Sequence, residues 1–124
     1  MNVEIISIGD ELLIGQTINT NSSWMGEQLS LIGASVYQIT TITDDESHIL
    51  ETLERASEKV NVVLITGGLG PTKDDITKHT LCKFFGSELV FYQDVFSRLE
   101  AFFSYSGLEM LDVNKDQAML PTNA

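Results

Sequence analysis

Three glycines in four positions mark the segment with the clearest chemical signature in this chain. Residues 66–75 read Thr-Gly-Gly-Leu-Gly-Pro-Thr-Lys-Asp-Asp and follow a short apolar run. Because glycines let the backbone approach a ligand closely and turn its N–H groups inward, such a loop suits a phosphate. The start of the next helix adds a partial positive charge, Lys73 adds a full one, and Thr66 and Thr72 supply hydroxyls. The segment has neither the Gly-Lys-Ser/Thr ending of a Walker loop nor the Gly-x-Gly-x-x-Gly spacing of a dinucleotide loop.

Two carboxylates, Asp74 and Asp75, lie next to this predicted phosphate loop. They would repel a phosphate unless a cation lay between them. A hard divalent ion such as Mg²⁺ commonly combines one or two carboxylates with water and phosphate oxygens. The alternative is that one of these residues only caps a helix and the glycines only make a turn. The residue types favour the ligand site.

A second glycine-bearing loop, residues 9–15, follows the first apolar run and contains Asp10 and Glu11. In open parallel sheets, ligands bind beyond the carboxyl ends of the strands, and both loops leave predicted strands at that edge. Asp10 and Glu11 are therefore candidates for a second carboxylate ligand or a general base, and capping of their own loop is the alternative.

Short apolar runs alternate with amphipathic stretches along the chain. Because strands that alternate with helices require crossover connections, the sequence predicts an α/β fold with a largely parallel sheet that helices cover on both faces. The strand at residues 62–65 is the most apolar and is expected to be central. We predict strands at 3–8, 35–42, 62–65 and 89–92. The first helix should follow the polar run at 19–22 and end at Gly33, and the second should be capped by Thr43-Asp44-Asp45. Further helices are expected from 75 or 76 to 86, from 94 to about 105, and at 114–119.

Each predicted helix has an apolar stripe that should face the core. On the second helix, the spacing of Glu51 and Arg55 also allows a weak surface ion pair. The stripes consist of Met25, Leu29 and Ile32; Ile49, Leu53 and Ala56; Ile76, Leu81, Phe84 and Phe85; and Val95, Leu99 and Phe102.

Composition bounds the class of protein. The 124 residues fit one domain, and the net charge of −11 makes a nucleic acid or an anionic membrane an unsuitable partner. The 43% hydrophobic content is that of a globular chain. The single cysteine, Cys82, and the absence of a signal-like N-terminus favour the cytoplasm, and we expect Cys82 to be a small core residue.

Three separated motifs resemble those of the molybdopterin-binding domain family, specifically its CinA (competence/damage-inducible protein) branch. The first is Gly-Asp-Glu-Leu-Leu-Ile-Gly-Gln at residues 9–16, followed by Asn21-Ser22. The second is residues 66–77, and the third comprises Asn114, Gln117-Ala118 and Pro121. The resemblance covers essentially the whole chain.

The resemblance implies a three-layer α/β/α sandwich over residues 1–124 that binds a phosphorylated pterin or nucleotide. It further implies metal-dependent hydrolysis of ADP-ribose to AMP and ribose 5-phosphate, and a homo-oligomer. The wider family also adenylylates molybdopterin or inserts molybdenum into it, so a molybdopterin-handling transferase and a non-catalytic nucleotide-binding module are the alternatives. The second domain of many members, which deamidates nicotinamide mononucleotide, is not found in these residues.

Asp75 matches the family's acidic residue, so the resemblance implies that it helps to hold a divalent metal. We expect Asp10 to be the second metal ligand. The expected catalytic set is Asp75, Asp74 and Glu11, in which Asp74 holds water or caps the helix. Two departures from the family pattern stand out: Asn19 occupies a position that is usually acidic, and the sequence ends at Ala124, before the family's last ligand-binding loop. The expected ligand-binding residues are Thr66, Gly67, Gly68, Leu69, Gly70, Pro71, Thr72, Lys73, Gly9, Asp10, Gly15 and Asn21.

Overall fold

The computed structural model describes residues 1–68, 76–109 and 117–122. The chain divides into two compact units, Met1–Gly68 and Leu69–Ala124. The first unit contains a parallel sheet with its helices. The described residues of the second unit contain two α-helices and a pair of short strands.

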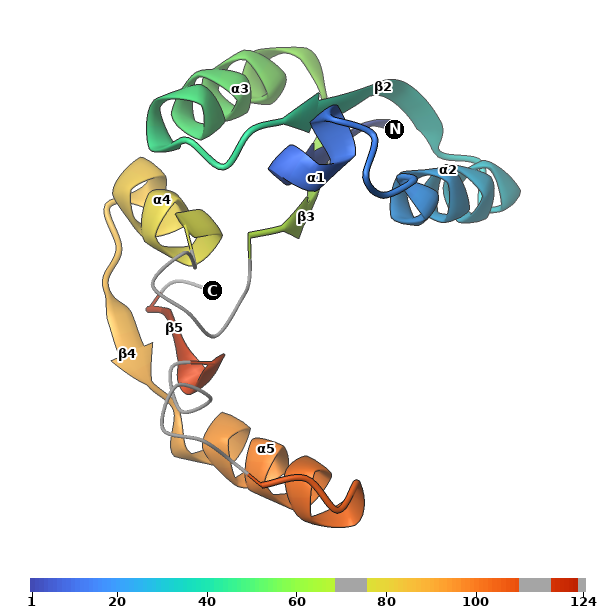
Figure 1. The fold of residues 1–124 in the computed structure, drawn as a ribbon. Helices are drawn as coiled ribbons and strands as arrows, with labels where there is room; N and C mark the ends of the chain where they lie inside the picture. Colours follow the sequence, from blue (N-terminus) through green and yellow to red (C-terminus); the bar gives the residue numbers. More distant parts are fainter. Residues whose placement is uncertain (69–75, 110–116, 123–124) are drawn as a thin grey trace. The chain divides into compact units, whose positions relative to one another are not determined.

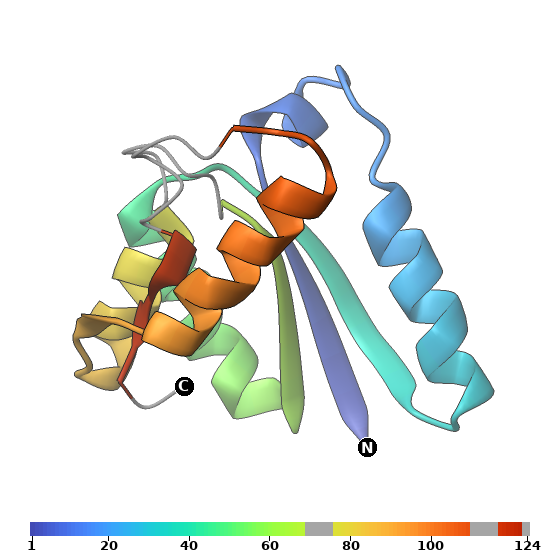
Figure 2. The same cartoon turned by 90° about the horizontal axis from the view of Figure 1, so that it is seen from below.

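The sheet of the first unit has three strands in the order β2-β1-β3, and both pairings are parallel. These strands are β1 (Asn2–Ile8), β2 (Ser35–Ile42) and β3 (Val62–Gly67), which lie side by side in Figure 2. The parallel α/β fold that the sequence predicts is confirmed.

The central strand of this sheet is β1, so the expectation that residues 62–65 would be central is wrong for the described part of the chain. All of β1 after Asn2 is buried, whereas every residue of β3 is only half-buried. Within residues 1–68, β3 pairs with β1 alone. The prediction failed because apolar content reports how well the faces of a strand are covered and does not report how many strands flank it.

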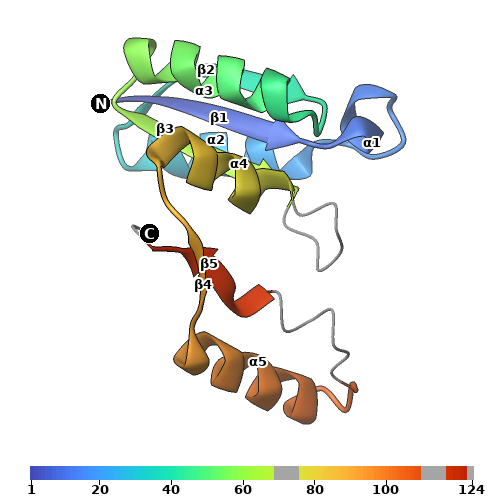
Figure 3. The same ribbon diagram turned by 90° about the vertical axis from the view of Figure 1, so that its left-hand side faces the viewer.

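Helices α2 (Thr20–Leu31) and α3 (Glu46–Lys59) cover opposite faces of this sheet, which makes three layers (Figure 1). The chain steps from β1 to β2 in one direction and then returns across β1 to β3. Because both crossovers are right-handed, reversing the direction places the two helices on opposite faces. A four-residue helix, α1 (Asp10–Leu13), follows directly at the end of β1 (Figure 3).

The start of α3 matches the predicted capping signal, because Asp45 is its N-cap. The side chain of Asp45 accepts a hydrogen bond from the backbone N–H of His48 at 3.0 Å, which satisfies one of the unpaired donors of the first turn. The predicted stripe of Ile49, Leu53 and Ala56 is buried, as expected.

On α2 the predicted stripe is only partly correct. Met25 and Leu29 are half-buried, but Ile32 is 78% exposed at the C-cap position. Gly33 then adopts a φ of 80°, the left-handed conformation that ends many helices.

The core of the first unit contains one charged side chain, Glu4, which is fully buried in β1. Its two carboxylate oxygens accept hydrogen bonds from both terminal nitrogens of Arg55, at 3.1 and 2.7 Å, and Thr40 donates a third at 3.0 Å. This bidentate ion pair, the fork between Glu4 and Arg55, raises the pKa of Arg55. The predicted Glu51–Arg55 surface pair is wrong, because the guanidinium points to the sheet.

The second unit contains α4 (Ile76–Phe85), β4 (Leu89–Phe91), α5 (Gln93–Tyr105) and β5 (Met119–Pro121). Strands β4 and β5 pair antiparallel (Figure 3). The predicted helix that ends at Met119 is wrong at that end, because Met119 begins β5, and residues 114–116 lie outside the described residues.

The apolar stripes of the second unit match the prediction only in part. Leu81, Val95 and Leu99 are half-buried and Cys82 is buried, as expected, but Phe85 and Phe102 are each 60% exposed. Ile76 and Phe84 are half-buried. Helical spacing identifies residues that share a face, but the side of that face that packs depends on the neighbouring elements.

Among the described helices, none is long and apolar enough to cross a membrane.

Candidate functional site

A cleft of about 170 Å³ lies at the carboxyl ends of β1 and β3. The chain leaves β1 toward β2 on one side and reaches β3 on the other, so these two strands flank the point where the strand order reverses. Open α/β sheets bind ligands at such a switch point. The cleft is lined by Ile8, Glu11, Leu12, Thr17, Ile18, Asn19, Thr20, Asn21, Thr66 and Gly67.

The first turn of α2 forms one wall of this cleft, and Asn19 is its N-cap. The Asn19 Oδ1 atom accepts a hydrogen bond from the backbone N–H of Ser22 at 3.3 Å, and its Nδ2 atom donates to the Ser7 hydroxyl at 2.9 Å. The hydroxyls of Ser7 and Ser22 are 3.1 Å apart and share a further hydrogen bond. The wall is thus tied to β1 through side chains.

The floor of the cleft at the end of β3 requires a glycine. Gly67 has a φ of 95° and lies opposite Ile8 in the parallel register. A Cβ atom at this position would collide with the Ile8 carbonyl oxygen. Gly67 therefore has a packing role in addition to the backbone donor role that the sequence suggested.

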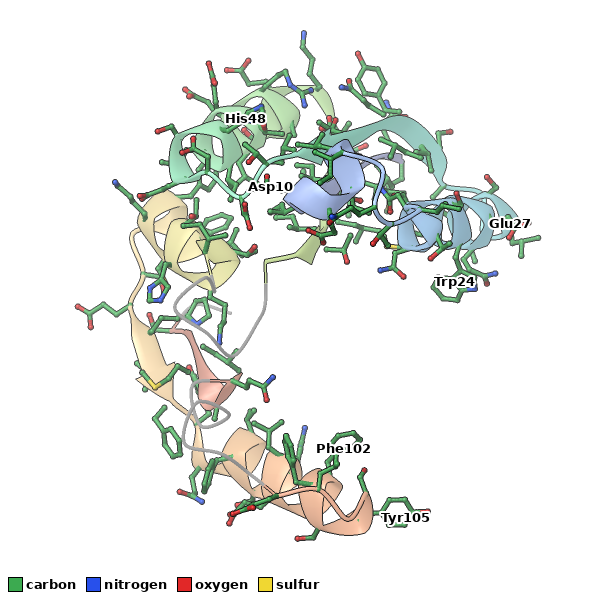
Figure 4. The ribbon with its side chains drawn as sticks, viewed as in Figure 1. Asp10, Trp24, Glu27, His48, Phe102 and Tyr105 are labelled. Carbon is green, nitrogen blue, oxygen red and sulfur yellow. The ribbon has the colours of Figure 1, made fainter. Side chains whose placement is uncertain are left out.

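Acidic side chains gather at the same edge of the sheet. Asp10, labelled in Figure 4, is exposed and its carboxylate accepts a hydrogen bond from the Thr43 hydroxyl. Asp44 has a raised pKa, first because of desolvation and then because Asp10 and Glu11 add negative charge nearby. Glu11 reaches the cleft from α1, and its carboxylate folds back over Gly9.

The structure brings four of the predicted site residues into one cleft: Glu11, Asn21, Thr66 and Gly67. Two others lie at its margins without lining it. Gly9 is buried and donates its N–H to the Ile42 carbonyl at 3.0 Å, and Asp10 faces Thr43.

The remaining predicted site residues divide into two groups. Gly15 lies in the turn that follows α1, with a φ of 77°, and Gly68 directly follows β3, with a φ of 64°. Leu69, Gly70, Pro71, Thr72, Lys73, Asp74 and Asp75 lie outside the described residues, and their roles stay predictions. In the part of the chain that the structure describes, no group of three acidic, histidine or cysteine side chains forms a metal site.

Sequence reasoning missed part of the cleft lining and the polar network behind it. The unpredicted lining residues include Leu12 of α1, and Thr17 and Ile18 from the segment between α1 and α2. One signal was available for the network, because Ser7 interrupts an otherwise apolar stretch of a strand that is buried on both faces, and a buried hydroxyl needs a partner.

Residues 4–123 match the family described as "Probable molybdopterin binding domain". The chain belongs to this family. Its CinA-type relatives include a "CinA-like protein" of Flavobacterium psychrophilum, 48% identical over 123 residues, and a "Putative competence-damage inducible protein" of Bacillus cereus, 40% identical over 124 residues. These alignments cover 98% and 100% of this chain and 29% and 30% of the relatives.

Solved structures of the molybdopterin-binding domain family share the fold. CinA from Thermoplasma acidophilum matches with a TM-score of 0.81 and 30% identity, over 98% of this chain and 70% of that one. The tungsten cofactor synthesizing protein MoaB from Pyrococcus furiosus matches with a TM-score of 0.65 and 20% identity, over 97% of this chain and 78% of that one. The predicted resemblance and fold class are confirmed.

The chain spans less than a third of the length of the curated relatives that it matches, 29% in the case of the Flavobacterium psychrophilum protein.

Proposed function

We propose that this domain binds a phosphorylated small molecule in the cleft between β1 and β3 and hydrolyses the pyrophosphate bond of ADP-ribose with a divalent metal ion, giving AMP and ribose 5-phosphate. The observation that carries the proposal is the position of the cleft. It lies at the topological switch point, and the chain runs from its floor at Thr66 and Gly67 directly into the predicted phosphate loop.

The donor chemistry of this edge fits a hard divalent cation. Asp10, Glu11 and Asp44 present carboxylate oxygens, and the pKa of Asp44 is raised first by desolvation and then by the negative charges of Asp10 and Glu11. Mg²⁺ uses one or two protein carboxylates and completes its shell with water and phosphate oxygens, so a site of three protein ligands is not required. We assign Asp10 and Asp75 as the ligands. A bound ion would polarise the pyrophosphate and lower the pKa of a coordinated water.

The cleft residues supply the remaining functions. Glu11 would accept a proton from the attacking water, a role supported by its position in the lining of the cleft on α1. The Thr66 hydroxyl and the Asn21 side chain line the same cleft and would donate hydrogen bonds to phosphoryl oxygens. Lys73 would add a positive charge, and Gly68 and Gly70 further backbone donors.

The test is release of AMP from ADP-ribose by this chain in the presence and absence of Mg²⁺. We expect metal-dependent turnover that Asp75→Ala abolishes and that Glu11→Gln lowers by about a hundredfold or more. Glu27→Gln is the matched control, since Glu27 is exposed on α2 and points away from the sheet (Figure 4). Metal-independent turnover, or turnover unaffected by Asp75→Ala, would contradict the proposal.

The family description favours a second candidate, a domain that binds molybdopterin and takes part in adenylyl transfer or molybdenum insertion. The same cleft and loop would then hold the phosphate of the pterin. An adenylylated product from molybdopterin and ATP, with no hydrolysis of ADP-ribose, would select this candidate. Saturable binding of ADP-ribose without turnover would instead indicate a non-catalytic nucleotide-binding module.

We also propose a homo-oligomer, on the basis of family membership. Sedimentation equilibrium of the 124-residue chain tests it, and a monomer at micromolar concentration would contradict it.

A further inference from the structure

Three polar side chains, Ser7, Asn19 and Ser22, join the end of β1 to the first turn of α2. Asn19 lines the cleft, whereas Ser7 and Ser22 do not. Ser7 is fully buried, Ser22 is 3% exposed, and Asn19 is half-buried. The Asn19 amide spans the gap, with its Nδ2 atom 2.9 Å from the Ser7 hydroxyl and its Oδ1 atom 3.3 Å from the Ser22 backbone nitrogen. The two hydroxyls complete a closed ring of contacts at 3.1 Å.

The donors and acceptors of this network match. The Ser7 oxygen accepts from Asn19, which leaves one proton on each hydroxyl for the bond between Ser7 and Ser22. Removal of one hydroxyl would leave a buried partner unsatisfied, which costs more than the bond itself contributes. A satisfied polar network of this kind therefore fixes the orientation of α2 relative to β1, which apolar contacts alone would leave less well defined.

The placement of α2 depends on this network to an unusual degree. Ser22 is the one residue of α2 that is buried, and the apolar residues Met25 and Leu29 are only half-buried. The large aromatic ring of Trp24 is 62% exposed and points away from the sheet (Figure 4). The first turn of α2 therefore buries little apolar surface, and the hydrogen bonds among Ser7, Asn19 and Ser22 hold it against β1.

The network also connects the two walls of the cleft. Ser7 lies opposite Thr66 in the parallel register of β1 and β3, and residues in register project to the same face of a sheet. Thr66 lines the cleft at the end of β3, while Thr20 and Asn21 line it from α2. A shift of α2 relative to Ser7 would thus change the distance between the Thr66 hydroxyl on one side of the cleft and the Thr20 and Asn21 side chains on the other.

From this geometry we propose that Ser7 and Ser22 are positioning residues that hold Thr20 and Asn21 over the cleft through Asn19, and so set its affinity for an anionic, phosphorylated ligand. The inference rests on the proposed function for its ligand. It assigns no contact with the ligand to Ser7 or Ser22, both of which lie behind the cleft.

A substitution at Asn19 can change the charge at the cleft without changing the position of α2. With Asn19→Asp, the carboxylate still accepts from the Ser22 N–H, and it now accepts from the Ser7 hydroxyl, while Ser22 donates to Ser7. The network stays closed, but a negative charge is added beside Glu11 at the cleft. We therefore expect Asn19→Asp to keep α2 in place, to weaken ADP-ribose binding without metal, and to make binding more dependent on Mg²⁺.

The test uses the 124-residue chain and two measurements, amide hydrogen exchange of residues 20–24 in the free protein and titration calorimetry with ADP-ribose and Mg²⁺. We expect Ser7→Ala and Ser22→Ala each to speed local exchange and to weaken binding by about tenfold. The double variant should bind no more weakly than the worse single one, because both act through one network. Ser23→Ala is the matched control on the exposed side of α2.

Unchanged exchange at residues 20–24 in Ser7→Ala would overturn the inference, and so would faster exchange with unaltered affinity. Additive losses in the double variant would also overturn it, since they indicate two independent contacts. Failure of the unsubstituted chain to bind ADP-ribose would contradict the proposed function, and the exchange measurement would still decide whether the network holds the first turn of α2.

Discussion

Gly67 was predicted as a ligand-binding glycine, and the packing of β3 against β1 also requires a glycine at this position. Its φ of 95° is unfavourable for any residue with a side chain, and the carbonyl of Ile8 occupies the position that a Cβ would take. The backbone of β3 can therefore turn toward the cleft immediately beside β1.

We expect Gly67→Ala to destabilise the chain by about 2 kcal/mol or more, because left-handed strain of about 1–2 kcal/mol adds to the collision with Ile8. Gly15→Ala is the control, since Gly15 has a similar φ of 77° but open space around its Cβ position. Urea denaturation of both variants measures the difference. An equal loss in the two variants would show that the close approach to Ile8 has no energetic effect.

Asp44 yields a prediction about pH. Its pKa is raised in the folded chain, so the folded state binds this proton more readily than the unfolded state, and stability falls as the pH rises through that pKa. Asp44→Asn removes the penalty. It should raise Tm by the order of a degree at pH 7, and this gain should vanish near pH ~3, where the carboxyl group is protonated in both states.

The control for Asp44→Asn is Asp45→Asn, which removes the same charge one residue later but retains an equally good cap for α3. An identical pH-dependent gain in both variants would attribute the effect to net charge and not to the neighbours of Asp44.

At the scale of secondary-structure elements, the fork between Glu4 and Arg55 joins the central strand to α3, and Thr40 extends it to β2. Glu4 is fully buried while the Arg55 side chain is 39% exposed, so the two partners are not equivalent. Loss of Arg55 would leave the buried Glu4 carboxylate without its ion-pair partner, whereas loss of the Glu4 carboxylate would leave an Arg55 side chain that can reach water.

We expect Arg55→Met to cost about 2–3 kcal/mol, a value lowered from that of a fully buried pair because Arg55 is partly solvated. Glu4→Gln should cost less, and Glu51→Gln, on the exposed face of α3, should stay within about 0.5 kcal/mol. Equilibrium urea unfolding compares the three. A larger loss for Glu4→Gln than for Arg55→Met would contradict the argument from burial.

At the scale of the whole molecule, the net charge of −11 imposes self-repulsion on every folded arrangement of this chain. Salt reduces that repulsion, because the Debye length falls from about 30 Å at 0.01 M to about 8 Å at 0.15 M ionic strength.

We therefore expect Tm at pH 7 to rise by several degrees between ~0.01 M and ~0.15 M NaCl. If the acidic edge binds a divalent ion as proposed, MgCl₂ at equal ionic strength should raise Tm further, and Asp10→Asn should remove most of the additional rise. Equal effects of the two salts would indicate screening alone. Differential scanning calorimetry is the measurement.

Local patterns in the sequence were enough to predict most elements and the edge of the sheet where the site lies. Strand 35–42 and the helix that follows the capping run Thr43-Asp44-Asp45 are confirmed, because capping chemistry and apolar period are properties of neighbouring residues. The motifs at residues 9–16 and 66–77 likewise predicted family and fold, and both follow strands whose carboxyl ends must meet in a parallel sheet.

Only the tertiary structure decided which strand is central, which face of each helix packs, and where the buried polar groups find partners. Arg55 turns from its helical neighbour Glu51 to Glu4 across the sheet, and Ser7 meets Asn19 and Ser22 beside the cleft. These pairings join residues 12 to 51 positions apart. Their energies depend on desolvation in the assembled core, and no local spacing in the sequence reports that quantity.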